Sequence, residues 1–227
     1  MAEVKRMICL ANSRKHYPGR CVAGKECSGG APGPWIRPVS GRPSQEVSED
    51  EQRYQNGALP ALLDIVDVPL IEALPASFQT ENWLLDPKGR WARVGHLAFR
   101  DLARFVDKPD KLWLNGYETK AGSNDRVPEA EAQKLRGSLC LLKLNSIRLR
   151  VFTTGADFGN PRKRVQAAFM YRGVQYRLWV TDLAIESAYR SKKEGDYDIA
   201  ECYLTVSLGE VDKGFCYKLV AAVIFPK

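Results

Sequence analysis

The stretch that decides the fold lies near the start of the chain, where residues 8–15 (ICLANSRK), 19–26 (GRCVAGKE) and 35–40 (WIRPVS) alternate with turns. Short runs of Val, Ile and Leu are typical of strands, and Gly and Pro are typical of the turns between them. Polar residues such as Asn12 and Arg37 fall near the ends of these strands, where a rigid sheet often presents binding groups. The stretch therefore predicts an N-terminal sheet and favours a binding function.

The same run, LANSRK…GRCVAGKE…WIRPVS, resembles the opening of bacterial proteins described as dual OB domain-containing. The resemblance is strongest over residues 7–40 and is compatible with the whole chain. It implies two OB-type barrels in tandem and a role with nucleic acid, in bacterial defence or conflict systems. It implies no catalytic residue.

Composition indicates an ordinary globular protein. The 227 residues are 44% hydrophobic and 27% charged, and they could form one large or two small domains. No apolar run reaches the roughly 18 residues that a membrane span needs. The charged start (MAEVKR) lacks the apolar segment of a secretory signal. Six scattered cysteines do not predict a disulfide framework, so we expect thiols, a cytoplasmic location and no contact with a membrane.

The charge balance suggests the partner. Lys and Arg number 34 against 27 Asp and Glu, which gives a formal net charge of +7. A basic surface favours polyanions because each Lys or Arg beside a phosphate releases counterions. Nucleic acid is therefore the expected partner, and a protein partner is the alternative.

The first half of the chain alternates short strand patterns with polar loops. Residues 41–56 predict a long loop or a short surface helix, and residues 117–131 predict a linker. Residues 95–107 predict a helix, because apolar residues recur on one face and Pro109 follows. We expect an N-terminal OB-like domain with long loop insertions over residues 1–125. Its expected strands are residues 5–12, 20–25, 35–39, 59–70, 83–85, 91–94 and 111–115.

The second half predicts a C-terminal OB-like domain over residues 132–227. Strand patterns are joined by a hairpin at Arg172-Gly173, and a helix over residues 182–190 follows with Asp182 as its cap. A bent first strand, a hairpin, a helix and two further strands match the OB order. The fold class is therefore mainly β with short helices, in two tandem OB-like β-barrels. The expected strands are residues 139–144 with 147–152, 164–171, 174–181, 200–208 and 215–225.

Alternation along these strands places Arg and aromatic side chains on one outward face. Arginine binds phosphate, and flat aromatic rings stack on bases. Solvated surface and domain–domain packing are the alternative readings of such a face. The predicted nucleic-acid-binding residues are Arg148, Arg150, Phe152, Arg164, Gln166, Arg177, Trp179 and Tyr203, with Arg162 and Lys163 at the edge.

A second candidate binding cluster lies in the N-terminal stretch. Asn and Ser can bond bases or sugars, and Arg and Lys can bind phosphate. The alternative is a loop that side-chain bonds to the backbone hold in place. The members of this cluster are Asn12, Ser13, Arg14, Lys15, Arg20 and Arg37.

No catalytic, metal or cofactor site is expected. The chain has two histidines, His16 and His96, and no Gly-x-Ser-x-Gly, Walker or dinucleotide motif. A zinc grouping of His16 with Cys9, Cys21 and Cys27 lacks the tight ligand pairs of zinc sites.

One pattern resembles a nuclease signature. Asp110 after a proline, followed by Glu118 and Lys120, could hold Mg²⁺ and a hydroxide, although the spacing is very short.

The leading hypothesis, which rests on the net charge and on the face of Arg and aromatic residues, is a non-catalytic protein that binds single-stranded DNA or RNA. The alternatives are a protein-interaction or nucleotide-sensing module and, third, a metal-dependent nuclease.

Overall fold

The structure is a computed structural model that describes residues 2–15, 19–28, 31–155 and 159–226. The chain divides into two compact units. The first unit comprises Met1–Val106 with Arg136–Ser138, and the second comprises Asp107–Leu135 with Leu139–Lys227. Both units are built mainly of strands, as the sequence predicted.

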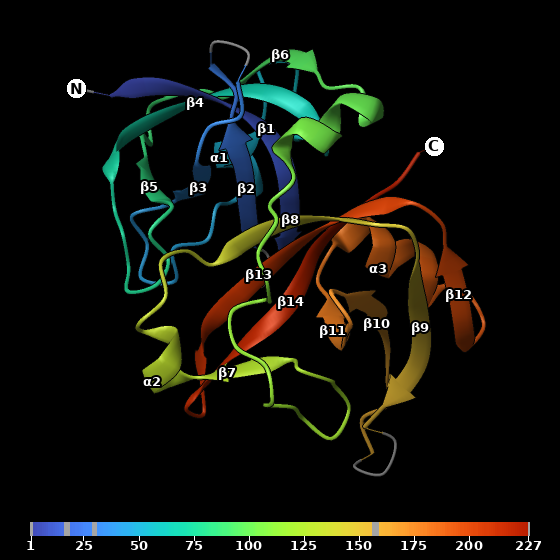
Figure 1. The fold of residues 1–227 in the computed structure, drawn as a ribbon. Coiled ribbons are helices and arrows are strands. Elements are labelled where there is room, and N and C mark those ends of the chain that lie inside the picture. The colour runs from blue at the N-terminus through green and yellow to red at the C-terminus, as the bar shows by residue number, and fades with distance from the viewer. Residues whose placement is uncertain (1, 16–18, 29–30, 156–158, 227) are drawn as a thin grey trace. The chain divides into compact units, whose positions relative to one another are not determined.

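The first unit contains short strands with little helix (Figure 1). Its elements are β1 (Glu3–Arg14), β2 (Arg20–Glu26), β3 (Trp35–Val39), α1 (Glu49–Gln52), β4 (Asp64–Ala73), β5 (Asn82–Leu85), β6 (Ala92–His96) and the 3₁₀ helix η2 (Phe99–Phe105).

Five of these strands close into a barrel. Antiparallel pairs join β1 to β2, β2 to β3, β5 to β4 and β4 back to β1, and β3 runs parallel to β5. The order 1-2-3-5-4-1, with α1 between the third and fourth strands, is the OB layout. β6 pairs with β4 outside this ring.

Closure depends on β1, which pairs with β4 along its first half and with β2 along its second half. The register of β1 against β2 shifts between Cys9 and Ala11, which bends the strand. Gly24 lies at the closest approach, because a Cβ there would stand 2.1 Å from the carbonyl oxygen of Ile8. Only glycine allows the two strands to meet at this point.

The second unit is also built mainly of strands. Its elements are β7 (Arg126–Pro128), α2 (Glu129–Ala132), β8 (Leu139–Leu144), β9 (Ile147–Thr154), β10 (Arg162–Tyr171), β11 (Val174–Val180), α3 (Leu183–Arg190), β12 (Gly195–Ile199), β13 (Cys202–Asp212) and β14 (Phe215–Ile224).

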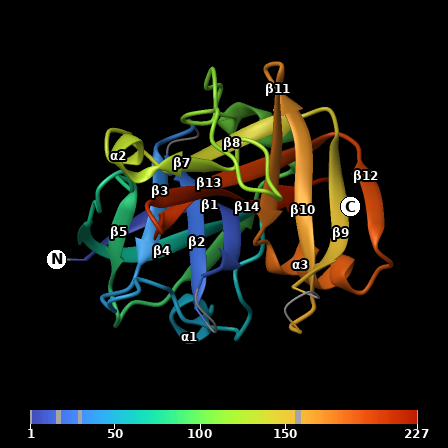
Figure 2. The ribbon, with the colours of Figure 1, turned by 90° about the horizontal axis from the view of Figure 1, so that it is seen from below.

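This unit also has the OB layout. β8 and β9 are one bent strand, interrupted only at Asn145 and Ser146. β9 pairs with β10, β10 with β11, and β11 runs parallel to β14, while β13 joins β14 to β8. The chain itself joins β8 to β9 at the bend, and α3 falls between the third and fourth strands of this order. Figure 2 shows β11, β10, β9 and β12 side by side.

Local signals of the second barrel are confirmed. Arg172 and Gly173 have φ of +47° and +76°, as the tight hairpin between β10 and β11 requires. Asp182 caps α3 by accepting bonds from the backbone of Ala184 and Ile185. The inward residues of β9, β10 and β11, such as Leu149, form the buried core.

The boundary between the units differs from the expected one at residue 125. Segment 107–125 belongs to the second unit, where Lys218 Nζ donates to the Leu114 carbonyl at 2.6 Å. Ser123 and Arg177 also exchange two backbone hydrogen bonds. These bonds hold the segment on the second barrel, so residues 117–131 are not a free linker.

Two local predictions were wrong, and one strand was missed. The helix expected over residues 95–107 is only the 3₁₀ turn η2, because Gly95 and its neighbours pair with β4. Residues 111–115 form no strand, and Trp113 has a φ of +59°. The edge strand β12 was not foreseen.

Candidate nucleic-acid interface

The predicted face lies on the outside of β9, β10 and β11. Gln166 of β10 stands opposite Arg150 on one side and Trp179 on the other. Ala168 likewise stands between Arg148 and Arg177. The Arg172-Gly173 hairpin sets the register between β10 and β11.

Four side chains of this face form a layered group, which we call the stacked cluster: Arg150, Phe152, Trp179 and Arg164. The rings of Phe152 and Trp179 stack with centroids 5.7 Å apart and an angle of 24° between their planes. The Arg150 guanidinium lies 5.0 Å from the Phe152 ring, and that of Arg164 lies 5.5 Å from the Trp179 ring. All four residues are partly or fully exposed. The two aromatic rings and the two guanidinium groups of the stacked cluster are therefore accessible to solvent at the same place on the surface.

Acidic residues of β12 border the face. Asp198 lies opposite Arg148 and accepts a hydrogen bond from its Nε at 2.8 Å, and Asp196 lies opposite Arg150. The Asp198 carboxylate, through this bond and its charge, raises the pKa of Arg148 above its ordinary value. The positive charge of the face is thus partly compensated by a strand that the sequence reading missed. The alternating acids of GDYDI were its only signal.

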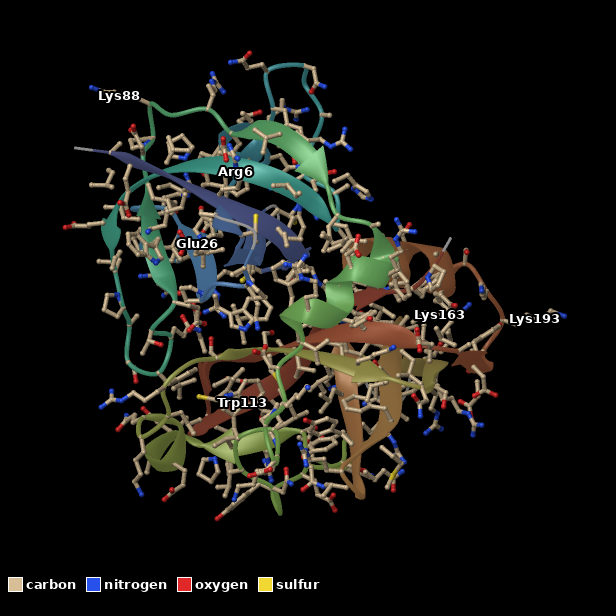
Figure 3. All side chains as sticks on the ribbon, turned by 45° about the horizontal axis from the view of Figure 1, so that its top comes forward. Arg6, Glu26, Lys88, Trp113, Lys163 and Lys193 are labelled. Atoms are coloured by element: carbon tan, nitrogen blue, oxygen red, sulfur yellow. The ribbon has the colours of Figure 1, made fainter. Side chains whose placement is uncertain are left out.

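Two further cations lie at the start of β10. Arg162 is exposed and donates from Nε to Asn160 at 3.4 Å. Lys163 donates to the Lys192 carbonyl at 2.6 Å. Figure 3 shows Lys163 and Lys193 on the same side of this unit, with Lys193 pointing outward. Side chains alternate along β10, so Arg162 shares the outward side of Arg164, whereas Lys163 lies on the side of the buried Val165.

Two predicted members of the face are buried. Gln166 is 1% exposed, because segment 117–125 crosses it and the Ala121 carbonyl accepts its Nε2 at 3.0 Å. Tyr203 is 2% exposed, and Thr205 on the same side of β13 is buried too. Arg177 stays partly exposed beside Ser123. The accessible face is smaller than the sequence suggested, because alternation cannot show what covers a strand.

The N-terminal cluster is mostly bonded to its own unit. Asn12 donates to Gln52 at 2.9 Å and to the Pro60 carbonyl at 3.1 Å. Ser13 is buried and donates to the Cys21 carbonyl. The alternative reading of this stretch, a loop held by side-chain bonds, fits these two residues better than a binding site.

The basic residues of this cluster divide into two groups. Arg37 is 5% exposed and contacts Ser138 at 2.7 Å and Glu81 at 3.1 Å, so it is a buried structural cation. Arg20 is paired with Glu49, whereas Arg14 and Lys15 are partly exposed. The exposed basic surface here is therefore narrow.

The catalytic and metal candidates are dispersed. Asp110, Glu118 and Lys120 are all exposed, and Asp110 lies 3.8 Å from Arg172. Among the described residues, no group of three or more His, Cys, Asp or Glu side chains could hold a metal ion. Burial raises the pKa of the Cys9 thiol to about 12, and His16 lies outside the described residues. His96 ends β6, where its Nδ1 lies 3.3 Å from Asp64.

A closed five-stranded ring and a second sheet with the same strand order, each with a helix between its third and fourth strands, define a protein of tandem OB domains. The chain belongs to the family of the dual OB-containing domain, whose sequence model matches residues 5–223. This match confirms the family that the N-terminal stretch suggested. No curated protein and no solved structure matches the chain. In the part of the chain that the structure describes, no helix is long and apolar enough to cross a membrane.

Proposed function

We propose that the protein binds single-stranded DNA or RNA without catalysis, on the outer face of β9, β10 and β11. The stacked cluster carries this proposal, because Phe152 and Trp179 stack with a guanidinium group over each ring. OB barrels commonly use this face, the one formed by their second and third strands, for oligonucleotides.

The chemistry of the cluster favours unpaired bases. Aromatic rings can stack only on bases that have left a duplex, and each such contact contributes about 1–3 kcal/mol with little sequence preference. Arg150 and Arg164 flank the rings, where phosphates of the same strand would run. The net charge of +7 adds a general attraction for polyanions.

The proposal includes a cytoplasmic location and a role in bacterial defence or conflict. Free thiols at all six cysteines support a reducing compartment. The role in conflict systems rests on the resemblance of the N-terminal stretch alone. Any Mg²⁺-dependent cleavage of the bound strand that Asp110→Ala abolishes would replace this proposal with the nuclease hypothesis.

The test is fluorescence anisotropy with labelled single-stranded DNA, RNA and duplex DNA at several salt concentrations. We expect the single strands to bind most tightly and affinity to fall steeply with salt. The double variant Phe152→Ala/Trp179→Ala should weaken binding strongly. Phe215→Ala is the matched control, because Phe215 forms the same kind of contact with Arg126, at 4.1 Å, outside the face. No binding at low salt, or equal loss in both variants, would refute the proposal.

A further inference from the structure

An open groove of about 590 Å³ lies where the bent strand of the second barrel turns from β8 into β9. It is lined by the bend itself and by the ends of β10 and β11 nearest their hairpin. A groove of this size is within the range of small-molecule sites. The lining residues used below are Lys143, Asn145, Arg148, Met170, Arg172, Gln175 and Asp198.

The groove continues the face of the stacked cluster. Arg148 lines the groove and stands two residues before Arg150 on β9, so both side chains point outward. Ala168, opposite Arg148, forms part of the groove wall without filling it. A chain bound along the face could therefore extend into the groove.

The groove contains three cations, Lys143, Arg148 and Arg172, and the carboxylate partner of each is exposed. Arg148 is bonded to Asp198, and Lys143 contacts Glu201 at 3.0 Å. Exposed ion pairs of this kind contribute little net stability, so an incoming anion can replace the carboxylate. The Asp198 oxygen stands where an oxygen of a bound phosphate would lie, since guanidinium groups bind carboxylate and phosphate in the same geometry.

Other residues of the groove lining suit a base. Asn145 and Gln175 are exposed amides that offer both donors and acceptors, which is the combination that base edges require. Met170 is 57% exposed, and its thioether provides a polarizable apolar surface beside them.

We propose that this groove is a binding site for a nucleoside phosphate, in which the phosphate replaces Asp198 on Arg148 and the base lies against Met170. The ligand is either a free nucleotide or the end of a strand held on the face, and the second case rests on the proposed function. Both sources present the same chemistry, so the experiment separates them.

The first measurement is calorimetric titration of the full chain with AMP, ribose 5-phosphate and adenosine. AMP should bind more tightly than ribose 5-phosphate, which lacks the base, and more tightly than adenosine, which lacks the phosphate. Asp198→Asn should tighten AMP binding roughly two- to fivefold, because it removes the competing carboxylate. Asp212→Asn makes the same charge change on β13 outside the groove and should have no effect. Equal effects of these two variants, or no AMP binding at millimolar concentration, would overturn the proposal.

A second pair of variants tests the base contact. Asn145→Ala/Gln175→Ala should weaken AMP about fivefold to tenfold, the loss expected for one or two hydrogen bonds, and leave ribose 5-phosphate unchanged. Gln133→Ala, an exposed glutamine outside the groove, is the control. A loss that is the same for AMP and ribose 5-phosphate would contradict recognition of the base.

Competition separates the two sources. If the groove holds the end of a strand, AMP should displace a labelled six-nucleotide strand in part, and Phe152→Ala/Trp179→Ala should weaken the strand but not AMP. AMP binding without any strand binding would refute the proposed function and leave the groove assignment standing. Strand binding that depends on Trp179 but is insensitive to AMP, with no AMP binding, would refute the groove alone.

Discussion

The two basic regions of this chain place the same residue types in opposite surroundings, one exposed and one buried. On β9, β10 and β11, Arg150 and Arg164 lie over aromatic rings that meet solvent. In the first unit, Arg37 is buried between Glu81 and Ser138, and Asn12 is bonded to Gln52. Arginine on an alternating strand indicates a binding surface only when its partners are rings or solvent rather than buried carboxylates.

The sharpest test of this contrast is the removal of Arg37. Arg37→Ala should lower the free energy of unfolding of the first unit by about 3–5 kcal/mol, because Glu81 would remain buried without its cation. Urea unfolding followed by tryptophan fluorescence measures the loss. Arg90→Ala, at an exposed position of the same unit, should change stability by less than about 0.5 kcal/mol. Similar values for the two variants would remove the distinction between the regions.

The complementary change is made on the stacked cluster. Trp179→Ala should weaken binding of a single strand by about 1–3 kcal/mol, the contribution of one stacked base. Because Trp179 is partly exposed, its loss should affect the unfolding of the second unit less than it affects binding. Anisotropy titration gives the change in binding free energy, and urea unfolding of the same preparation gives the change in the free energy of unfolding. An effect on unfolding alone would assign the ring a purely structural role.

Lys218 in the second unit is also a buried cation, and its surroundings differ from those of Arg37. Arg37 has a carboxylate partner, whereas Lys218 donates to the carbonyl of Leu114 and to Asn115, so burial lowers its pKa to about 7. The unfolded chain therefore binds more protons than the folded one between pH 7 and the ordinary lysine pKa. Lys218 should therefore make the stability of the second unit rise from pH 7 to about pH 8.5, by at most about 1.4 kcal/mol per pH unit. Above that range the thiols of Cys202 and Cys216 oppose the rise, because burial raises their pKa to about 12 and about 11.

Lys218→Met should flatten this pH dependence. Thermal unfolding of the wild type and the variant between pH 6.5 and about 8.5 checks the prediction, because the thiols stay protonated in that range. A wild-type profile that falls with rising pH, or one that Lys218→Met leaves unchanged, would show that another group titrates.

The smallest expected effect concerns the acidic border of the face. Asp196→Asn/Asp198→Asn should tighten binding of a single strand roughly two- to fivefold by removing two competing carboxylates. Asp212→Asn/Glu210→Gln makes the same charge change on β13 and should leave affinity nearly constant. If both double variants tighten binding equally, the effect comes from the net charge of the protein and not from the position of the β12 carboxylates beside the face.

Much of the second barrel could be predicted from sequence because its signals are local. Alternation in IRLRVF and RVQAAFMY separates inside from outside, and Arg172-Gly173 fixes the register that sets Gln166 opposite Trp179. The order of strands around one helix then gives the OB layout without any knowledge of distant contacts.

The errors concern long-range contacts. Nothing near Gln166 in the sequence indicates that Ala121 covers it, 45 residues away. β12 is rich in Gly and Asp, which strands usually avoid, and it forms only because β9 offers an unpaired edge. Residues 95–107 carry a helical spacing, but pairing of Gly95 with β4 delays the turn until Phe99.

The carboxylates of β12 have a consequence for how the protein would respond to its surroundings. An incoming strand that takes Arg148 from Asp198 sets a carboxylate free, and that carboxylate attracts sodium or potassium ions again. Part of the ion release that normally drives such association is thereby cancelled at this position. Affinity at this edge should consequently vary less between dilute and concentrated electrolyte than a count of the arginines implies.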